Sequence, residues 1–123
     1  MKSGTLCLAA ISVFAFAFPA LAHHSAAAYD REKRVTVTGA VTEYHWVNPH
    51  VWVHMRVSMP DGKVQNWSLE SESVGQLTRK GWTRDSFKPG DVITATVEQL
   101  KDGSFGGLLG TIKKADGTEL KAN

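Results

Sequence analysis

Cysteine is almost absent from this chain of 123 residues. The one cysteine, Cys7, lies in an apolar run near the start of the chain, and residues 23–123 contain none. That part of the chain can therefore form no internal disulfide bond and no thiolate metal site. An excess of charge of one sign is also missing, because the formal net charge is only +2 at pH 7. So small a net charge indicates no nucleic-acid partner and no anionic membrane surface as a target.

The sequence also lacks the motifs of several enzyme classes. The serines between residues 68 and 73 have no G-x-S-x-G motif around them, and no phosphate-binding glycine loop is present. Gly106-Gly107 is more typical of a bend in a strand. Glu70 and Glu72 lie two residues apart at a strand end, where we expect them to be solvated. We predict no catalytic residues and no enzyme activity.

A long apolar run is missing as well. The apolar residues 6–18 follow the positive start Met1-Lys2 and precede the small-x-small pattern Ala20-Leu21-Ala22. This arrangement predicts a signal peptide over residues 1–22, because the run is shorter than the about 20 residues that span a bilayer. We expect a periplasmic or secreted protein with no stable membrane anchor after cleavage. An uncleaved anchor or a buried helix is the alternative interpretation.

The remaining chain is predicted to form an N-terminal arm over residues 23–33 and one domain over residues 34–123. Apolar and polar residues alternate over residues 34–47, 50–57 and 64–71, then over 92–100 and 105–114, which indicates strands. Gly39 suggests a bulge or sharp bend in the first of these strands, and residues 115–118 can begin a short sixth one. Ser73 and Gln76 form a capping-box pattern that predicts a short helix ending at Gly81.

This order of strand, strand, strand, short helix, strand, strand (β-β-β-α-β-β) predicts an all-β fold with one short helix. We interpret it as a small OB-like β-barrel, with a five-stranded meander and a packed helix as the alternative. An OB-like barrel binds its ligands across its second and third strands and the neighbouring loops. That location is an analogy at the level of the fold, because a fold alone assigns no function.

Polar and aromatic residues gather around the predicted Asn48-Pro49 turn, opposite a face of valines. Trp67 and Trp82 lie in apolar surroundings and are predicted to be in the core, whereas the tryptophans beside the turn are candidates for stacking on a ligand. The candidate ligand-binding residues are His45, Trp46, Asn48, His50, Trp52 and His54. We expect a binding module for a small-molecule, glycan or protein ligand. A structural accessory subunit is the alternative.

All five histidines follow residue 22. His50 and His54 lie four apart on a strand, about 13 Å from each other, so they cannot bind one ion together. A tight Asn48-Pro49 turn would instead bring His45 and His50 within cross-strand distance. If cleavage makes His23 the first residue, its amine and its imidazole can chelate one copper ion. His23, His45 and His50 are therefore candidate metal ligands, and a copper-binding or copper-handling protein is a second functional hypothesis. The alternative is a solvated arm with surface histidines.

Several segments together resemble the DUF6152 family of exported bacterial proteins. They are "AHHSAAAYD", "VTVTGAVTEYHWVNPHVWVHMRV", "DGKVQNWSLES", "LTRKGWTRDSFKPGDVITATV" and "DGTEL". Residues 48–50 and 79–91 are the most distinctive, and Ala26 stands near a place where members have an aromatic residue. The resemblance implies export and a small β domain. It transfers no catalytic residues, because the family has no established activity.

Overall fold

The computed structural model describes residues 26–123, so the predicted signal peptide and the two N-terminal histidines lie outside the described residues. The described part is mostly β-sheet with one short α-helix, as the sequence predicted. Its elements are η1 (Ala26–Ala28), β1 (Tyr29–His45), β2 (Trp52–Ser58), β3 (Val64–Glu70), α1 (Val74–Arg79), β4 (Val92–Leu100), β5 (Gly106–Lys114) and β6 (Glu119–Lys121).

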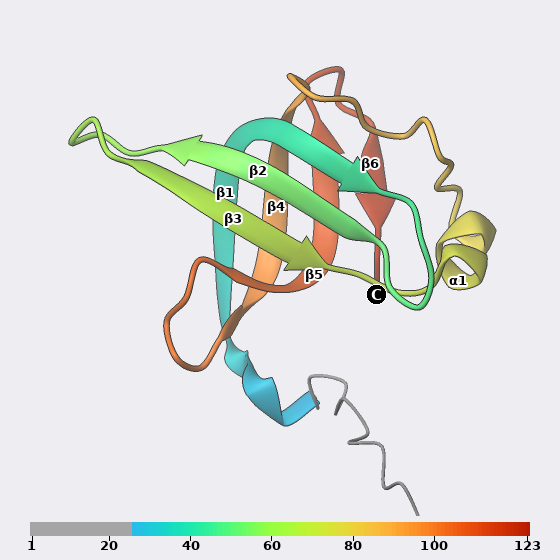
Figure 1. Cartoon of the computed structure of the whole chain (residues 1–123), viewed down its shortest axis with the longest axis horizontal. Helices are drawn as coiled ribbons and strands as arrows, with labels where there is room; N and C mark the ends of the chain where they lie inside the picture. The colour runs from blue at the N-terminus through green and yellow to red at the C-terminus, as the bar shows by residue number, and fades with distance from the viewer. Residues whose placement is uncertain (1–25) are drawn as a thin grey trace, which may run out of the picture.

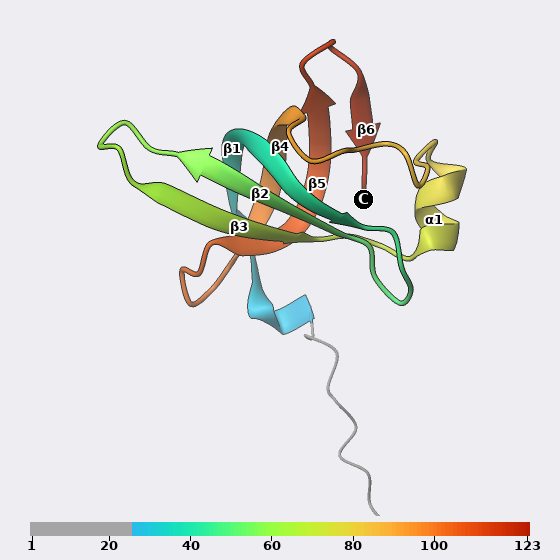
Figure 2. The ribbon, with the colours of Figure 1, turned by 45° about the horizontal axis from the view of Figure 1, so that its top comes forward.

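The six strands form one sheet in the order β3-β2-β1-β4-β5-β6. Neighbours in this order are antiparallel, but β3 makes a further, parallel pairing with β5 over Ser68–Glu70. The strand pairings therefore run in a ring from β1 through β2, β3, β5 and β4 back to β1, and β6 adds to β5. Figures 1 and 2 show β2 and β3 crossing in front of β4 and β5, with α1 at one end.

The two faces of β2 differ as the alternating sequence predicted. Val53, Met55 and Val57 are buried in the core, together with Val51 just before the strand. The residues between them are half-buried or exposed. The core also contains Trp67 and Trp82, which confirms their predicted positions. Successive side chains of a strand point to opposite faces of the sheet. Apolar residues at every second position are therefore buried together on one face, and their burial stabilises the strand.

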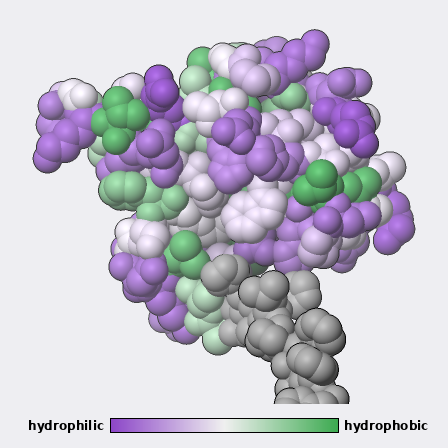
Figure 3. Space-filling model, viewed as in Figure 1, coloured by the Kyte–Doolittle hydropathy of each residue, from purple (hydrophilic) through white to green (hydrophobic). Residues whose placement is uncertain are grey.

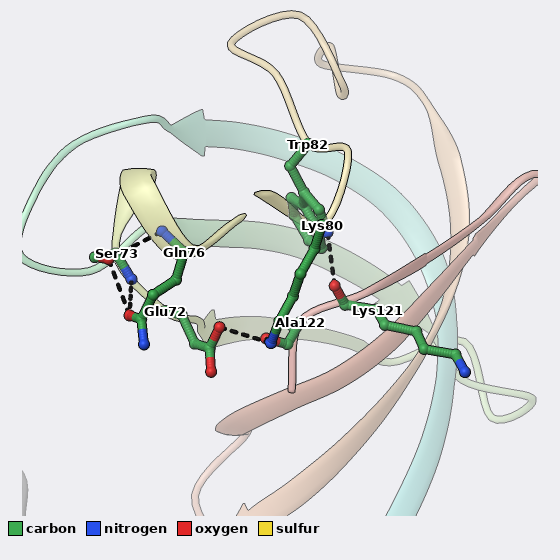
Figure 4. A network of polar contacts seen from close by, with 7 residues as sticks. All are labelled: Glu72, Ser73, Gln76, Lys80, Trp82, Lys121 and Ala122. Carbon is green, nitrogen blue, oxygen red and sulfur yellow. Dashed lines mark hydrogen bonds and ion pairs between the residues drawn. The ribbon is translucent and has the colours of Figure 1, made fainter. Parts of the chain in front are cut away.

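The helix α1 begins and ends at the predicted residues. Ser73 is its N-cap and forms the capping box with Gln76, while Gly81 follows the helix with a positive φ of 88°. Side chains next to α1 fasten it to the end of the chain: Lys80 Nζ donates to Ala122 O, and Trp82 Nε1 donates to Lys121 O (Figure 4). Among the helices of residues 26–123, none has the length and apolar content needed to cross a membrane.

The first strand differs from the sequence prediction in its start and in the position of its irregularity. The first strand begins at Tyr29, inside the predicted arm, because Tyr29 pairs with Leu100 ahead of an irregular stretch that ends at Arg34. The four residues between them, Asp30–Lys33, are all charged, so no apolar alternation marked this part of the strand. The irregularity predicted at Gly39 lies instead between Val41 and Glu43.

Gly39 is explained by a close approach of two backbones. A Cβ atom at this position would lie 2.2 Å from Arg56 O, on the neighbouring strand. Gly75 in α1 is different, because a Cβ atom there would have nothing within 4 Å. The same substitution should therefore have opposite effects at the two positions.

We expect Gly39→Ala to lower the free energy of unfolding by about 2 kcal/mol or more, since a backbone must move to admit the methyl group. Gly75→Ala should raise it by up to about 1 kcal/mol, because alanine is the better helix former. Urea denaturation followed by circular dichroism measures both values. A tolerated Gly39→Ala variant would contradict the pairing of β1 with β2.

Candidate functional site

A buried carboxylate, that of Glu70, lies at the end of β3. Glu70 is only 5% exposed, so the expectation that it is solvated was wrong. The Tyr29 hydroxyl donates a hydrogen bond to Oε2 of Glu70, and Nδ1 of His50 contacts Oε1. Its two oxygens are thus both engaged, as a buried charge requires.

The two partners reach Glu70 because different parts of the chain meet there. Tyr29 stands at the start of β1, where it pairs with Leu100 of β4. His50 belongs to the loop between β1 and β2, and its neighbour Val51 exchanges backbone hydrogen bonds with the segment after β3. Val51 N donates to Glu72 O, and Ser71 N donates to Val51 O. These bonds hold the loop against the end of β3, which places His50 beside Glu70.

The environment of Tyr29 keeps its hydroxyl protonated. Burial raises the pKa of this hydroxyl well above its ordinary value, and the hydrogen bond to Glu70 and the negative charge of that residue raise it further. Tyr29 is therefore a hydrogen-bond donor to Glu70 at neutral pH.

Two clefts adjoin this cluster, and Tyr29 and Glu70 line both. The first cleft has a volume of about 260 Å³ and is lined by Tyr29, Trp52, Ser68, Glu70, Leu100, Ser104, Phe105, Gly106 and Gly107. The second cleft has a volume of about 250 Å³ and is lined by Tyr29, His50, Glu70, Ser71, Glu72, Gln76, Leu108 and Asn123. Trp52 thus belongs to the first cleft and His50 to the second.

His45 and His54 form a separate outer cluster with Glu43 and Ser68. The two imidazole rings are 5.1 Å apart between centroids, in an edge-to-face arrangement. His45 Nε2 lies 2.7 Å from a Glu43 oxygen, and His54 Nδ1 lies 2.9 Å from Ser68 Oγ. Burial lowers the pKa of His54, and the nearby charge of His45 lowers it further, while Glu43 opposes this shift. The environment of His54 therefore favours its neutral form.

The turn does not bring His45 and His50 together as a metal pair. His45 pairs across the strands with Trp52, because the whole segment 46–51 forms the connection between β1 and β2. Its ring therefore contacts His54, while His50 contacts Glu70. Within residues 26–123, no three His, Cys, Asp or Glu side chains are grouped so that they could hold a metal ion. The third candidate ligand, His23, lies outside the described residues.

Two other predicted ligand-binding residues have structural contacts. Asn48 Oδ1 accepts a hydrogen bond from Val74 N, at the start of α1. The Trp46 ring lies 5.9 Å from that of Tyr44 and packs against the core. Neither lines the two clefts, so of the six predicted residues only Trp52 and His50 do.

Sequence reasoning missed three residues of this region: Tyr29, Glu70 and Phe105. Tyr29 was assigned to the arm, Glu70 was expected in solvent, and Phe105 was only the first residue of a strand. None belongs to a motif. Their shared location depends on pairings between strands that are far apart in the sequence, such as β3 with β5.

We expect Tyr29→Phe to lower the free energy of unfolding by about 1–3 kcal/mol, because it leaves a buried carboxylate with one partner fewer. Tyr44→Phe is the matched control. The Tyr44 hydroxyl donates to Thr83 O at an exposed position, where water can replace it, so the loss should be smaller. Chemical denaturation of both variants makes the comparison, and equal losses would show that Glu70 does not depend on Tyr29.

The lowered pKa of His54 predicts a pH dependence of stability. The unfolded chain binds a proton at this residue below about pH 6.5, whereas the folded chain resists it. Stability should therefore fall as the pH drops through that value, and His54→Gln should remove this part of the fall. Thermal unfolding of both proteins at pH 7.5 and 5.5 tests this. If the melting temperatures of the parent and of His54→Gln differed by the same amount at both pH values, the prediction would be contradicted.

Comparison with known proteins identifies the family. The model of a family described as a family of unknown function (DUF6152) matches residues 10–111. Searches of curated proteins and of solved structures found no match. Because the family model covers most of the chain, this protein belongs to the DUF6152 family.

Proposed function

We propose that this protein is an exported, non-enzymatic binding module, in which an OB-like barrel binds a small ligand in the first cleft. The ring of pairings from β1 through β2, β3, β5 and β4 supports the barrel, as does the position of α1 between β3 and β4 in the chain. The apolar run before the signal-peptidase pattern supports export to the periplasm or the medium.

The location of the first cleft is the observation on which this proposal rests. The cleft lies between Trp52 on β2, the end of β3, and the loop from β4 to β5, which ends at Phe105. Strands 2 and 3 and the loop between strands 4 and 5 are where OB-like barrels bind their ligands. Phe105 is 48% exposed, which is high for so large an apolar side chain. A ligand between the two aromatic residues would cover it.

Glycines form one wall of the first cleft. A Cβ atom on Gly106 would lie 2.7 Å from Ser68 O, and one on Gly107 would lie 2.1 Å from Glu98 O. β5 can therefore run close to both β3 and β4 only with glycine at these positions. The result is a wall made of backbone, beside Trp52 and Phe105.

The size and lining of the cleft favour a small ligand with one ring. A volume of about 260 Å³ is below the roughly 300–1,000 Å³ of drug-sized ligand sites. Trp52 and Phe105 offer stacking surfaces, and Ser68 and Ser104 offer hydroxyls. Glu70 can accept further hydrogen bonds, because a carboxylate has about four acceptor positions. These features suit a sugar ring, or a similar ring that carries hydroxyl or N–H donors.

The face shown in Figure 3 bears on the kind of partner. Outside the area that grey atoms cover, its apolar residues form separate green patches among polar side chains. Obligate protein interfaces usually present larger continuous apolar areas. This face therefore favours a small ligand over an obligate protein partner.

The test is a ligand-observed NMR screen of monosaccharides and small ring compounds, followed by titration of the hits. We expect hits to compete for one site and to bind Trp52→Ala about 10-fold or more weakly, because a stacking surface is lost. Trp46→Ala is the matched control and should bind like the parent. The first cleft would be excluded as the binding site if the hits bound both variants with the same affinity. The same conclusion would follow if, on titration, the hits shifted only protein resonances of the outer cluster.

A further inference from the structure

Ser71 carries a buried hydroxyl for which the fold supplies no partner. The residue is only 3% exposed. Within residues 26–123, its Oγ is the one buried side-chain nitrogen or oxygen atom that has no hydrogen-bond partner. Burial of a hydroxyl without a partner is costly, so folded proteins keep few such groups and each one needs an explanation. A ligand that donates a hydrogen bond to Ser71 would supply the missing partner.

The backbone holds Ser71 in the wall of the second cleft. Ser71 N donates to Val51 O at 2.9 Å, and Val51 N donates to Glu72 O at 3.0 Å. These two bonds fix the segment after β3 against the loop between β1 and β2. Ser71 lines the second cleft together with its neighbours in the sequence, Glu70 and Glu72. The hydroxyl without a partner therefore belongs to the same wall as two carboxylates.

The second cleft offers acceptors for a positively charged group. The carboxylates of Glu70 and Glu72 line it, and no lysine or arginine does. Lys80 Nζ donates to Glu72 Oε2 at 2.7 Å (Figure 4), which shows that this carboxylate is placed to bind an ammonium group. A carboxylate has about four acceptor positions, so Glu72 can accept further hydrogen bonds beside the one from Lys80.

The volume of the second cleft and its apolar lining limit the size of the ligand. The volume of about 250 Å³ is below the roughly 300–1,000 Å³ of sites for drug-sized ligands. Leu108 and the ring of Tyr29 add apolar surface beside the polar groups. A positively charged donor that is attached to a short carbon chain matches this combination.

We propose that the second cleft binds a primary amine in its ammonium form. The N–H groups would donate to Ser71 Oγ and to the carboxylate of Glu72, and the short carbon chain would lie beside Leu108. The site is distinct from the first cleft, because neither Ser71 nor Glu72 lines the first cleft. A free amine and the lysine side chain of another protein both carry this group, and the experiment separates these two sources.

The experiment is an NMR titration of the full chain with n-butylammonium. We expect saturable shifts in the backbone amide resonances of residues 70–72. The neutral analogue 1-butanol and the anion butanoate have similar carbon chains and should produce no such shifts. A second titration uses lysine that is blocked at its backbone amine and carboxyl groups. Tighter binding of blocked lysine than of n-butylammonium would assign the site to a lysine side chain, and weaker binding would assign it to a free amine.

Ser71→Ala distinguishes a hydroxyl that binds a ligand from one that stabilises the fold. We expect it to weaken n-butylammonium binding about 10-fold, because one hydrogen bond to the ligand is lost. The melting temperature of the free protein should stay the same or rise, because the hydroxyl has no partner to lose. Ser58→Ala, at the exposed end of β2, is the matched control and should change neither quantity.

Two further substitutions test the role of charge. Glu72→Gln should weaken n-butylammonium binding about 10-fold or more, because a charged acceptor becomes neutral. Glu119→Gln, at an exposed position of β6, is the matched control and should bind like the parent. Lys80→Gln should strengthen binding, because it removes a positive charge that competes for Glu72. Circular dichroism checks that each variant is folded.

Three results would overturn the proposal. One is the absence of saturable shifts with both amines. Another is binding of 1-butanol or butanoate as tightly as n-butylammonium. The third is equal affinity of the parent and Ser71→Ala for n-butylammonium. None of these results depends on whether a ring compound binds in the first cleft, so the two proposals can fail separately.

Discussion

The carboxylate of Glu70 is a charge inside the protein, and its partners come from distant parts of the chain. Tyr29 lies 41 positions before it and His50 lies 20 positions before it. A buried charge without partners is costly, so the start of β1 and the loop between β1 and β2 must both lie against the end of β3. Both clefts are bounded by this cluster. The geometry around them therefore depends on the carboxyl group of Glu70 and its two contacts.

The parallel pairing of β3 with β5 makes this arrangement possible. It covers only Ser68–Glu70, but it brings the loop after β4 beside the residues that surround Glu70. The close approach requires glycine at positions 106 and 107, where a side chain would meet the backbone of a neighbouring strand. The ring of strand pairings and the backbone wall of the first cleft thus both depend on the close approach of β5 to β3 and β4.

The polar and aromatic residues around Asn48-Pro49 make three different kinds of contact. Asn48 accepts a hydrogen bond from Val74 N at the start of α1, and Trp46 packs against the core. His45 and His54 contact each other on the outer face of β1 and β2. Trp52 and His50 turn to the two clefts, on either side of Glu70. Residues that are neighbours in the sequence therefore separate into contacts with the helix and the core, contacts on the outer face, and the lining of the two clefts.

Local rules explain what the sequence determined by itself. Alternating valines marked the buried face of β2, and the capping box at Ser73 with Gly81 marked α1, because these signals depend on residues a few positions apart. The sequence likewise identified the family and placed Trp67 and Trp82 in the core. Tertiary structure alone decided that Tyr29 belongs to a strand, that Glu70 is buried, and that His50 and not His45 meets it. These facts follow from pairings such as Tyr29 with Leu100 and Ser68 with Gly106. No local pattern encodes them, because the paired residues lie tens of positions apart and their contact exists only once the sheet has closed.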